Sequence, residues 1–330
     1  MDKRILMMSH KTDIDGMGSI VLSKVAFNNV TYLLFENPLE LSEKFIHLLE
    51  KNYLDNFNQV YICDLSLNKT IMDLINNNLE LKNKIKIFDH HQKAIEDGLD
   101  KYDFCTIIEK DNNKKRCGTD LFYDYLCNNS FILKNKASDE FTELTRLEDV
   151  WEWKKHGEFG IKAHDLTYLF NTVKQEKYIE IMVDKIKNND LNFSKEELLI
   201  INNIKSKLNK KMDELLKNAL FLVDDNNIEF ITLFADYEDR NDITDYIENK
   251  YNYKYKYAVI VSLNKGDYGQ KSYRSIDINI NVNDICKKYG GGGHPGAAGV
   301  LITKNQREII NGLNLKEGLK YIVNCGYIKE

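Results

Sequence analysis

Seven acidic or histidine side chains fall in three short segments of the N-terminal third: His10, Asp13, Asp15, Asp64, Asp89, His90 and His91. If the fold brings them together, their carboxylates repel one another unless a cation compensates the charge. Carboxylates and imidazoles without thiolates suit a hard or borderline divalent ion such as Mn²⁺ or Mg²⁺. Two such ions about 3.5–4 Å apart lower the pKa of a water molecule and neutralise charge on a phosphoryl group. The residue types therefore predict hydrolysis of a phosphate ester.

The elements that precede these residues must position them. Four short apolar segments of this region are typical of buried strands, and three of them lead directly into the acidic and histidine residues. The apolar segments are 5–8, 30–35, 60–63 and 85–88, and helical patterns lie between them at 16–27, 39–49 and 69–78. Alternating strands and helices predict a parallel α/β sheet, in which ligands bind at the carboxyl ends of the strands. We therefore expect the acidic and histidine residues at one edge of that sheet.

Each of these motifs also has a simpler explanation. A single Asp-X-Asp or His-His pair occurs more often in an exposed loop than in a metal site, and Asp13 and Asp15 alone could cap the helix at 16–27. The agreement of three separate strand ends favours the metal site. Three further histidines belong to no motif and are expected to pack against helices or lie on the surface: His47, His156 and His164.

The second candidate site is a glycine-rich segment. Residues 290–299 contain six of the 17 glycines and one of the two prolines, between a helical pattern at 282–289 and a strand-like segment at 299–302. Glycines lack Cβ, so consecutive backbone N–H groups can approach an anion closely. A tight turn with positive φ would explain one or two of these glycines but hardly four in a row. The predicted phosphate-binding residues are Gly291, Gly292, Gly293, His294, Arg274 with its guanidinium fork, and Ser275.

Gly118 and Thr119 precede a helical pattern at 120–127. The N-terminus of such a helix could help to hold a phosphate. Thr119 acting as an ordinary N-cap is the more common arrangement, however, and we prefer it here. Neither residue is therefore included among the predicted site residues.

Domain organisation follows from changes of pattern along the 330 residues, a length typical of two domains. The pattern is mainly helical from 118 to 187, and Ser194 with Glu197 forms a capping box before a long amphipathic stretch. Strand-like segments follow at 220–223, 228–234, 257–263 and 272–278. We predict an α/β fold with three parts: a parallel-sheet N-terminal domain (1–190), a connector helix (191–220) and a smaller C-terminal α/β domain (221–330).

Composition excludes several classes of protein. Lys plus Arg number 46 against 51 Asp plus Glu, a formal charge of −5, whereas general duplex-binding proteins usually carry a basic surplus. No apolar run reaches the roughly 18 residues of a membrane span, and the N-terminus lacks the apolar core of a signal peptide. The six cysteines show no CxxC spacing and predict reduced thiols in a cytoplasmic protein. We expect neither long duplex nucleic acid nor a membrane as a partner.

The motifs together resemble those of a known family. Asp89-His90-His91, with the segment 10–15 and Asp64, is similar to the signatures of the DHH phosphoesterase superfamily. Residues 272–275 and the Gly-Gly-Gly-His sequence within 290–299 resemble the DHH-associated C-terminal domain. The motifs occur in the family's order over nearly the whole chain. Within the superfamily, the resemblance is to oligoribonuclease (nanoRNase)-like and cyclic-nucleotide phosphodiesterase-like members rather than to RecJ-like exonucleases.

The resemblance implies a role for each matching residue. One ion would be held by His10, Asp13 and Asp64, and the other by Asp15, Asp64, His90 and Asp149, so that Asp64 bridges the two. Asp149 lies where the family has an aspartate, but Glu148 and Glu152 are close by, and the residues alone do not choose among the three. Asp89 would orient a ligand histidine. His91 would face the scissile phosphate.

The resemblance also implies an activity. We expect a phosphodiesterase with two divalent ions, Mn²⁺ being favoured over Mg²⁺ or Co²⁺, that hydrolyses short oligoribonucleotides, including dinucleotides, to mononucleotides. The acidic charge favours a short substrate, because a long strand would need a basic track. Alternatives are a cyclic mono- or dinucleotide or a 3′-phosphoadenosine nucleotide as substrate, an inorganic pyrophosphatase, and a nucleotide sensor without turnover. The family also makes a homodimer an expectation.

Overall fold

The computed structural model describes residues 3–263, 269–277 and 279–324, and the chain divides into two compact units, Met1–Asn202 and Asn203–Glu330. The division falls inside α10 (Lys195–Leu216), the helix that the sequence interpretation treats as a connector. The predicted capping box is present at its start. Ser194 N–H donates to Glu197 Oε2 at 2.8 Å, and Glu197 N–H donates to Ser194 Oγ at 3.2 Å.

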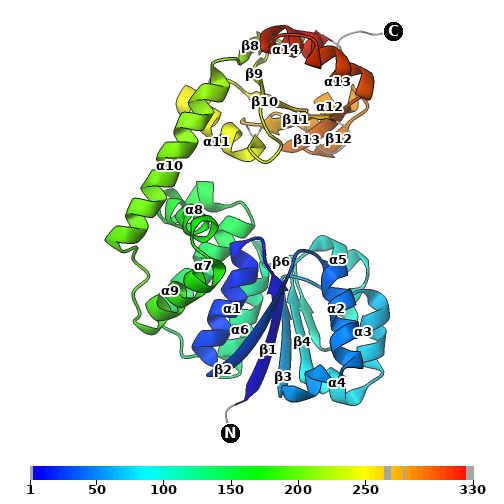
Figure 1. Ribbon diagram of the computed structural model, residues 1–330, viewed down its shortest axis with the longest axis vertical. Helices are drawn as coiled ribbons and strands as arrows, with labels where there is room; N and C mark the ends of the chain where they lie inside the picture. Colours follow the sequence, from blue (N-terminus) through cyan, green and yellow to red (C-terminus); the bar gives the residue numbers. More distant parts are fainter. Residues whose placement is uncertain (1–2, 264–268, 278, 325–330) are drawn as a thin grey trace. The chain divides into compact units, whose positions relative to one another are not determined.

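Unit 1 is built on a five-stranded parallel sheet with the strand order β2-β1-β3-β4-β5 (Figure 1). Its strands are β1 (Arg4–His10), β2 (Asn29–Phe35), β3 (Gln59–Cys63), β4 (Ile85–Asp89) and β5 (Cys105–Ile107). Side chains of β1 alternate between two buried clusters, with Ile5 and Met7 on one face and Leu6 and Met8 on the other. Because both faces are covered, the strands are continuously apolar, which explains why the sequence revealed them.

Helices cover both faces of this sheet (Figure 1). One face carries α1 (Ile14–Ala26), α6 (Gly118–Asn128), α7 (Lys136–Asp149), α8 (Gly157–Thr172) and α9 (Gln175–Lys187). The other carries α2 (Pro38–Glu50), α3 (Lys69–Asn76), α4 (Leu79–Lys84) and α5 (Gln92–Glu96). Three 3₁₀ helices (Tyr53–Asn56, Leu99–Lys101, Trp153–His156) and a small hairpin, β6 (Lys110–Asp111) and β7 (Lys114–Lys115), complete the unit. The predicted alternation of strands and helices is confirmed.

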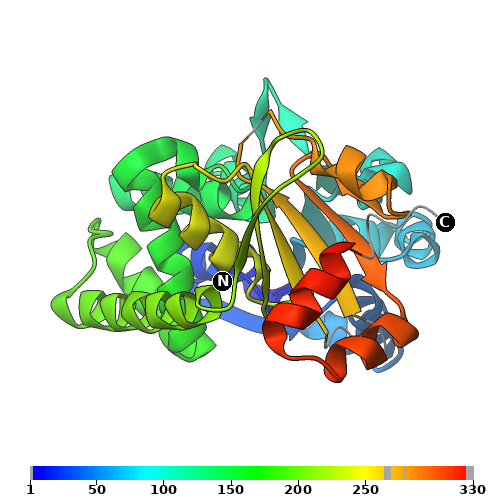
Figure 2. The ribbon, with the colours of Figure 1, turned by 90° about the horizontal axis from the view of Figure 1, so that it is seen from above.

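Unit 2 contains a six-stranded sheet with the order β12-β13-β11-β10-β9-β8, in which only β9 and β10 are parallel. The strands are β8 (Leu220–Val223), β9 (Glu229–Phe234), β10 (Tyr257–Ser262), β11 (Gly269–Ser275), β12 (Gly292–His294) and β13 (Ala297–Ile302). The helices are α11 (Arg240–Tyr251), α12 (Val282–Lys287), α13 (Lys304–Asn311) and α14 (Leu315–Asn324). Figure 2 shows α13 and α14 (red) beside the strands, where Ile310 and Leu319 join one buried cluster with Val261.

One predicted strand of unit 2 has different bounds in the structure. The strand predicted at 272–278 lies earlier, at Gly269–Ser275, and residue 278 is outside the described residues. Its first residues pair on both sides, Gly269 with Ile302 and Gln270 with Ser262, so tertiary pairing decides the register where the sequence is polar.

Separately, no helix in the described ranges has the length and apolar character that crossing a membrane requires.

Candidate metal centre and substrate-binding residues

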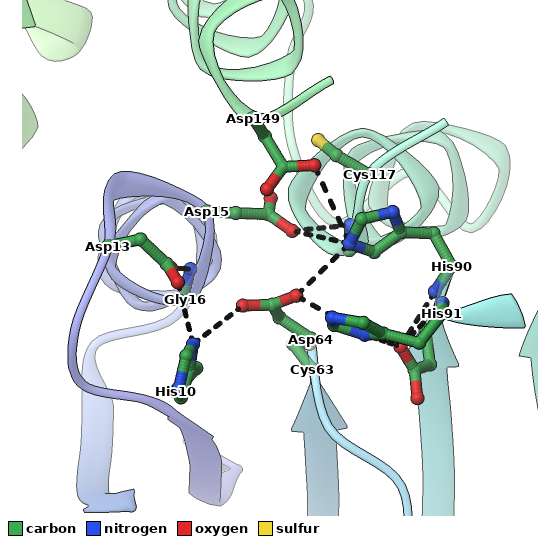
Figure 3. A network of polar contacts seen from close by, with 12 residues as sticks. His10, Asp13, Asp15, Gly16, Cys63, Asp64, His90, His91, Cys117 and Asp149 are labelled. Carbon is green, nitrogen blue, oxygen red and sulfur yellow. Dashed lines mark hydrogen bonds and ion pairs between the residues drawn. The ribbon is translucent and has the colours of Figure 1, made fainter. Parts of the chain in front are cut away.

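The carboxyl ends of three neighbouring strands bring the predicted acidic and histidine residues to one place (Figure 3). β1 ends at His10, β4 ends at Asp89, and Asp64 directly follows β3. These strands are adjacent and parallel, so their ends share one edge of the sheet. The six predicted ligands fall into two groups of three whose ligand atoms lie within 4.8 Å of one another, and Asp64, His90 and His91 form a third such group.

His10, Asp13 and Asp64 form the first group. His10 Nδ1 lies 2.6 Å from Asp13 Oδ2 and 3.5 Å from Asp64 Oδ2. Its Nε2 lies 3.0 Å from the main-chain oxygen of Glu36. Because that oxygen can only accept, the proton of a neutral ring sits on Nε2 and the Nδ1 lone pair is left for a cation. Asp13 also caps α1 by accepting from Gly16 N–H through Oδ1 at 3.0 Å, so capping and the ligand role use different oxygens.

His90 is the centre of the second group. Its Nε2 lies 3.3 Å from Asp64 Oδ1, 3.5 Å from Asp149 Oδ2 and 3.8 Å from Asp15 Oδ2. Asp64 turns one oxygen toward this group and the other toward His10, and Figure 3 shows it between the two groups. This is the arrangement that a carboxylate shared by two ions requires.

Of the three neighbouring acids, Asp149 is the one that reaches His90. Glu148 Oε1 instead lies 2.9 Å from His164 Nδ1, and Glu152 Oε2 accepts from Arg146 Nη1 at 3.1 Å. His164 stacks on Trp153, with ring centroids 4.3 Å apart, in agreement with its predicted packing role. The residues alone left this choice open, because adjacent positions at the end of a helix point in different directions.

The N-terminus of α6 holds Asp15. Gly118 N–H and Thr119 N–H each donate to one carboxylate oxygen of Asp15 at 2.7 Å, and Thr119 Oγ1 donates to its main-chain oxygen at 2.5 Å. Cys117, not Thr119, is the N-cap of α6, so the predicted capping role of Thr119 is wrong. The predicted alternative, a phosphate at this helix terminus, is wrong too, since those N–H groups are already used. The positive end of α6 stabilises a fully buried carboxylate instead.

Asp89 and His91 form a hydrogen-bonded pair at the centre, where His91 Nδ1 also lies 3.9 Å from Asp64 Oδ1. Asp89 Oδ1 lies 2.7 Å from His91 Nδ1 and accepts main-chain N–H groups of His90 and His91 at 2.7 and 3.2 Å. Its Oδ2 accepts from Ser66 Oγ at 2.5 Å. The ring that Asp89 orients is therefore His91, which forms a further candidate ligand group with Asp64 and His90. That Asp89 orients a metal-ligating histidine stays a prediction. Ser66 was missed because a lone serine after a strand carries no distinctive signal.

Two buried oxygens at the centre fit a bound cation. Asp64 Oδ2 and Asp149 Oδ2 are buried and have no hydrogen-bond partner among the described residues. Burial and the negative charge of Asp15 raise the pKa of Asp64 to about 7, and the same two causes raise the pKa of Asp149 well above its usual value. Leaving such carboxylates charged and unpaired is costly, and a divalent cation removes that cost. The donor set of carboxylates and imidazoles suits Mn²⁺ or Mg²⁺.

Without a cation, the histidines take up the charge. Hydrogen bonds to Asp13 and Asp64 raise the pKa of His10 to about 10. Burial lowers the pKa of His90, but its hydrogen bond to Asp64 and the charge of Asp149 outweigh that effect and raise it to about 10. The hydrogen bond to Asp89 likewise raises the pKa of His91. A cation must therefore compete with protons at two of its ligands.

The predicted substrate-binding residues of unit 2 meet around one strand. Arg274 on β11 and His294 on β12 both pair with Ala297, from opposite sides of β13. Arg274 Nε donates to Asn241 Oδ1 at 3.2 Å, a partner that nothing in the sequence pattern had indicated. Ser275 Oγ donates to the main-chain oxygen of Asp277 at 2.6 Å, which occupies its hydroxyl hydrogen.

Most of the four consecutive glycines are needed by the backbone itself. Gly290 has φ 73° and Gly293 has φ 152°. A Cβ on Gly291 would lie 2.3 Å from the main-chain oxygen of Gly299, whereas one on Gly292 would meet nothing closer than 3.9 Å. Gly292 and Gly293 lie in strand β12 of a tight hairpin, and Gly290 and Gly291 come just before it. The backbone thus accounts for three of the four glycines and leaves Gly292 unexplained. Anion binding by this segment stays a prediction.

A known domain family and a known protein match this chain. A model of the DHHA1 domain matches residues 227–316, within unit 2. Oligoribonuclease NrnB of Bacillus subtilis (strain 168) is 27% identical over 305 residues, covering 90% of this chain and 73% of that protein.

Two solved structures confirm the predicted α/β fold class. The pGpG-specific phosphodiesterase PggH from Vibrio cholerae is 13% identical, with a TM-score of 0.53 over 96% of this chain and 98% of that one. Exonuclease RecJ bound to manganese is also 13% identical, with a TM-score of 0.51 over 98% of this chain and 90% of that one. At such low identity the likeness concerns the fold.

Proposed function

We propose, from the premise that this chain belongs to the DHH phosphoesterase superfamily, that it is a metal-dependent phosphodiesterase which hydrolyses short oligoribonucleotides, including dinucleotides, to mononucleotides. The observation that carries the proposal is the arrangement of two groups of ligands around Asp64. The relative from Bacillus subtilis, named an oligoribonuclease, supports the choice of substrate.

In this proposal the residues of unit 1 hold the ions and orient the reacting phosphate. His10, Asp13 and Asp64 would bind one divalent ion, and Asp15, Asp64, His90 and Asp149 the other. Bound there, Mn²⁺, or else Mg²⁺ or Co²⁺, would supply a water of lowered pKa and positive charge opposite the phosphoryl oxygens. Asp89 fixes the tautomer of His91, placing the proton on Nδ1 and turning Nε2 away from Asp89. That ring is 53% exposed and free to face a phosphate oxygen.

Residues of unit 2 would bind the end of the substrate. Arg274 brings a guanidinium that can pair with a phosphate through two hydrogen bonds, and His294 faces solvent on the edge strand β12. Gly291, Gly292, Gly293 and Ser275 are the further binding residues of this proposal. The formal charge of −5 favours short substrates over long nucleic acid. The proposed location of the protein is the cytoplasm.

The test is a product profile with the purified protein and Mn²⁺. A labelled dinucleotide, a longer RNA, a cyclic dinucleotide, a 3′-phosphorylated adenosine nucleotide and pyrophosphate are compared at equal concentration. We expect the dinucleotide to be hydrolysed fastest, to mononucleotides, and chelation to abolish the activity. Asp64→Asn should remove it, while Asp124→Asn, which changes an exposed carboxylate on α6, should not.

Other outcomes would point to the alternatives. Faster hydrolysis of the cyclic dinucleotide or of the 3′-phosphorylated nucleotide would replace the substrate but keep the chemistry. If pyrophosphate were hydrolysed and none of the nucleotides were, the assignment of unit 2 to binding the end of a nucleotide substrate would be wrong. Binding of the dinucleotide without turnover under any divalent metal would show a sensor.

A further inference from the structure

Beside the candidate metal centre, unit 1 contains an open cavity of about 720 Å³ that none of the roles above uses. Three of its lining residues belong to the centre or its supporting pair: His10, Asp89 and His91. The volume lies in the range typical of small-molecule sites, about 300–1,000 Å³. A group attached to a phosphate at the centre can therefore enter this cavity past His91.

The floor of the cavity is aliphatic. Leu65, Leu67 and Leu99 line it and are almost completely buried, at 4%, 1% and 4% exposure. Leu39 stands at the rim on the first turn of α2 and is 68% exposed. An exposed leucine beside buried ones offers a face for a flat apolar body that is not part of the chain.

The polar groups at the rim are mainly hydrogen-bond donors. Asn37 and Asn68 cap α2 and α3 through their side-chain oxygens, which leaves each amide nitrogen free to donate elsewhere. The Lys69 ammonium group has no ion pair or hydrogen bond within the described part of the chain. The carboxylates at the rim are neutralised, Glu36 by Lys11 and Asp97 by Lys93. An acceptor-bearing or anionic ligand is thus favoured over a cationic one.

We propose that this cavity binds the nucleoside attached to the scissile phosphate, with its base against the leucines and its acceptor atoms toward Asn37, Asn68 and Lys69. The proposal rests on the proposed function and names the part of the substrate that unit 1 holds. A nucleoside combines a flat, weakly polar ring with carbonyl and ring-nitrogen acceptors, which matches both the floor and the rim. Since leucines offer no hydrogen bonds, discrimination among the four bases is weak at this position.

The first experiment separates binding from catalysis in the full-length protein. Leu39→Ser and Lys69→Ala should each raise KM for a dinucleotide roughly three- to tenfold while kcat stays within about twofold. The matched controls are Leu133→Ser, at a leucine that is 90% exposed, and Lys210→Ala, at an exposed lysine of α10. Both controls should keep the wild-type KM. Unchanged KM in Leu39→Ser and Lys69→Ala would overturn the proposal.

The second experiment locates the ligand without relying on turnover. Leu39→Cys is treated with a thiol reagent at pH 7 in the presence of Mn²⁺, with and without dinucleotide or AMP, and modification of that peptide is followed by mass spectrometry. We expect bound nucleotide to slow modification at least threefold, and to leave Leu133→Cys unaffected. The described native cysteines are buried or part-buried and react slowly.

The two proposals fail in different ways. If the wild type hydrolyses dinucleotides but they do not protect Leu39→Cys, the proposed function stands and the cavity assignment is wrong. If the wild type hydrolyses no dinucleotide yet AMP protects Leu39→Cys selectively, the cavity binds nucleosides and the oligoribonuclease proposal is wrong. Absence of both hydrolysis and protection overturns the two together.

Discussion

At the scale of single residues, Asp64 is the side chain on which both ligand groups depend. One of its oxygens lies 3.5 Å from His10 and the other 3.3 Å from His90. Its backbone has φ 59°, a left-handed conformation that asparagine and aspartate tolerate better than other residues with a Cβ. Asparagine is therefore the substitution that removes the charge and keeps the backbone.

We predict that Asp64→Asn and Asp149→Asn differ in the number of ions they lose. Asp64 serves both groups and Asp149 serves one. Asp64→Asn should therefore lower the affinity for both ions by roughly a hundredfold or more, whereas Asp149→Asn should lower the affinity for only one of them. Titration of the chelator-treated protein with Mn²⁺, followed by electron paramagnetic resonance, counts the bound ions. Asp124→Asn should bind as many as the wild type. Equal losses in the two variants would show that Asp64 is not shared.

The raised pKa values of His10 and His90 predict that metal binding releases protons. Both values are about 10 instead of 6.5, so the protonated rings stabilise the metal-free fold fully below pH 6.5, and this stabilisation is lost as the pH rises through about 10. At pH 7.5 an incoming ion must displace both protons, and Mn²⁺ affinity should rise with pH across this window. Calorimetric titrations in two buffers of different ionisation enthalpy should give at least two protons released, because the raised pKa values of Asp64 and Asp149 add to the release from the two histidines. His90→Asn should release about one proton fewer than the wild type, and no release at all would contradict the assignment.

At the scale of elements, α6 positions a ligand through its backbone. Gly118 N–H binds Asp15, and a Cβ at Gly118 would lie 2.7 Å from the Asp64 nitrogen and 2.9 Å from its Cα. Gly118→Ala must therefore move either α6 or the end of β3, and with them two predicted ligands. We expect roughly tenfold weaker Mn²⁺ binding, measured by titration.

The matched control for that substitution is Gly312→Ala. Its φ is −86° and the nearest atom to its Cβ would be the Ile309 oxygen at 3.5 Å, so no group must shift. Thermal unfolding of both variants separates a local effect on the ions from a general loss of stability. If Gly118→Ala binds Mn²⁺ as tightly as Gly312→Ala does, α6 does not position the centre.

How far the elements could be predicted depends on what determined each of them. Strands β1, β3 and β4 are buried on both faces and read as apolar segments, so the sheet edge and the cluster at it were predictable. The N-terminus of α6 reaches Asp15 across more than a hundred residues, a contact that only the tertiary fold creates. Register in β11 and the hairpin at β12 also depend on neighbouring strands, where local sequence carries little information.

At the scale of the whole molecule, the predicted metal ligands and the predicted substrate-binding residues around the glycine segment belong to different compact units. Every predicted metal ligand lies in Met1–Asn202, and Arg274 with the glycine segment lies in Asn203–Glu330. The helix α10 contributes to both, since Ile201 joins a buried cluster of the first unit and Met212 one of the second. Metal affinity and the part of substrate affinity that Arg274 would supply therefore depend on different sets of residues.

This separation predicts independent effects of substitutions in the two units. Arg274→Ala should raise KM for a dinucleotide roughly tenfold and leave the Mn²⁺ dissociation constants within about twofold, because Arg274 belongs to none of the groups that would hold the ions. Asp149→Asn should lower the affinity for one Mn²⁺ ion. The double variant, Arg274→Ala with Asp149→Asn, should bind Mn²⁺ as Asp149→Asn alone does. Lys316→Ala, which removes an exposed positive charge from the same unit as Arg274, should change neither quantity. A change of more than tenfold in Mn²⁺ affinity on Arg274→Ala would mean that the arginine acts on the ions, and recognition and chemistry would then have to be assigned to a single site.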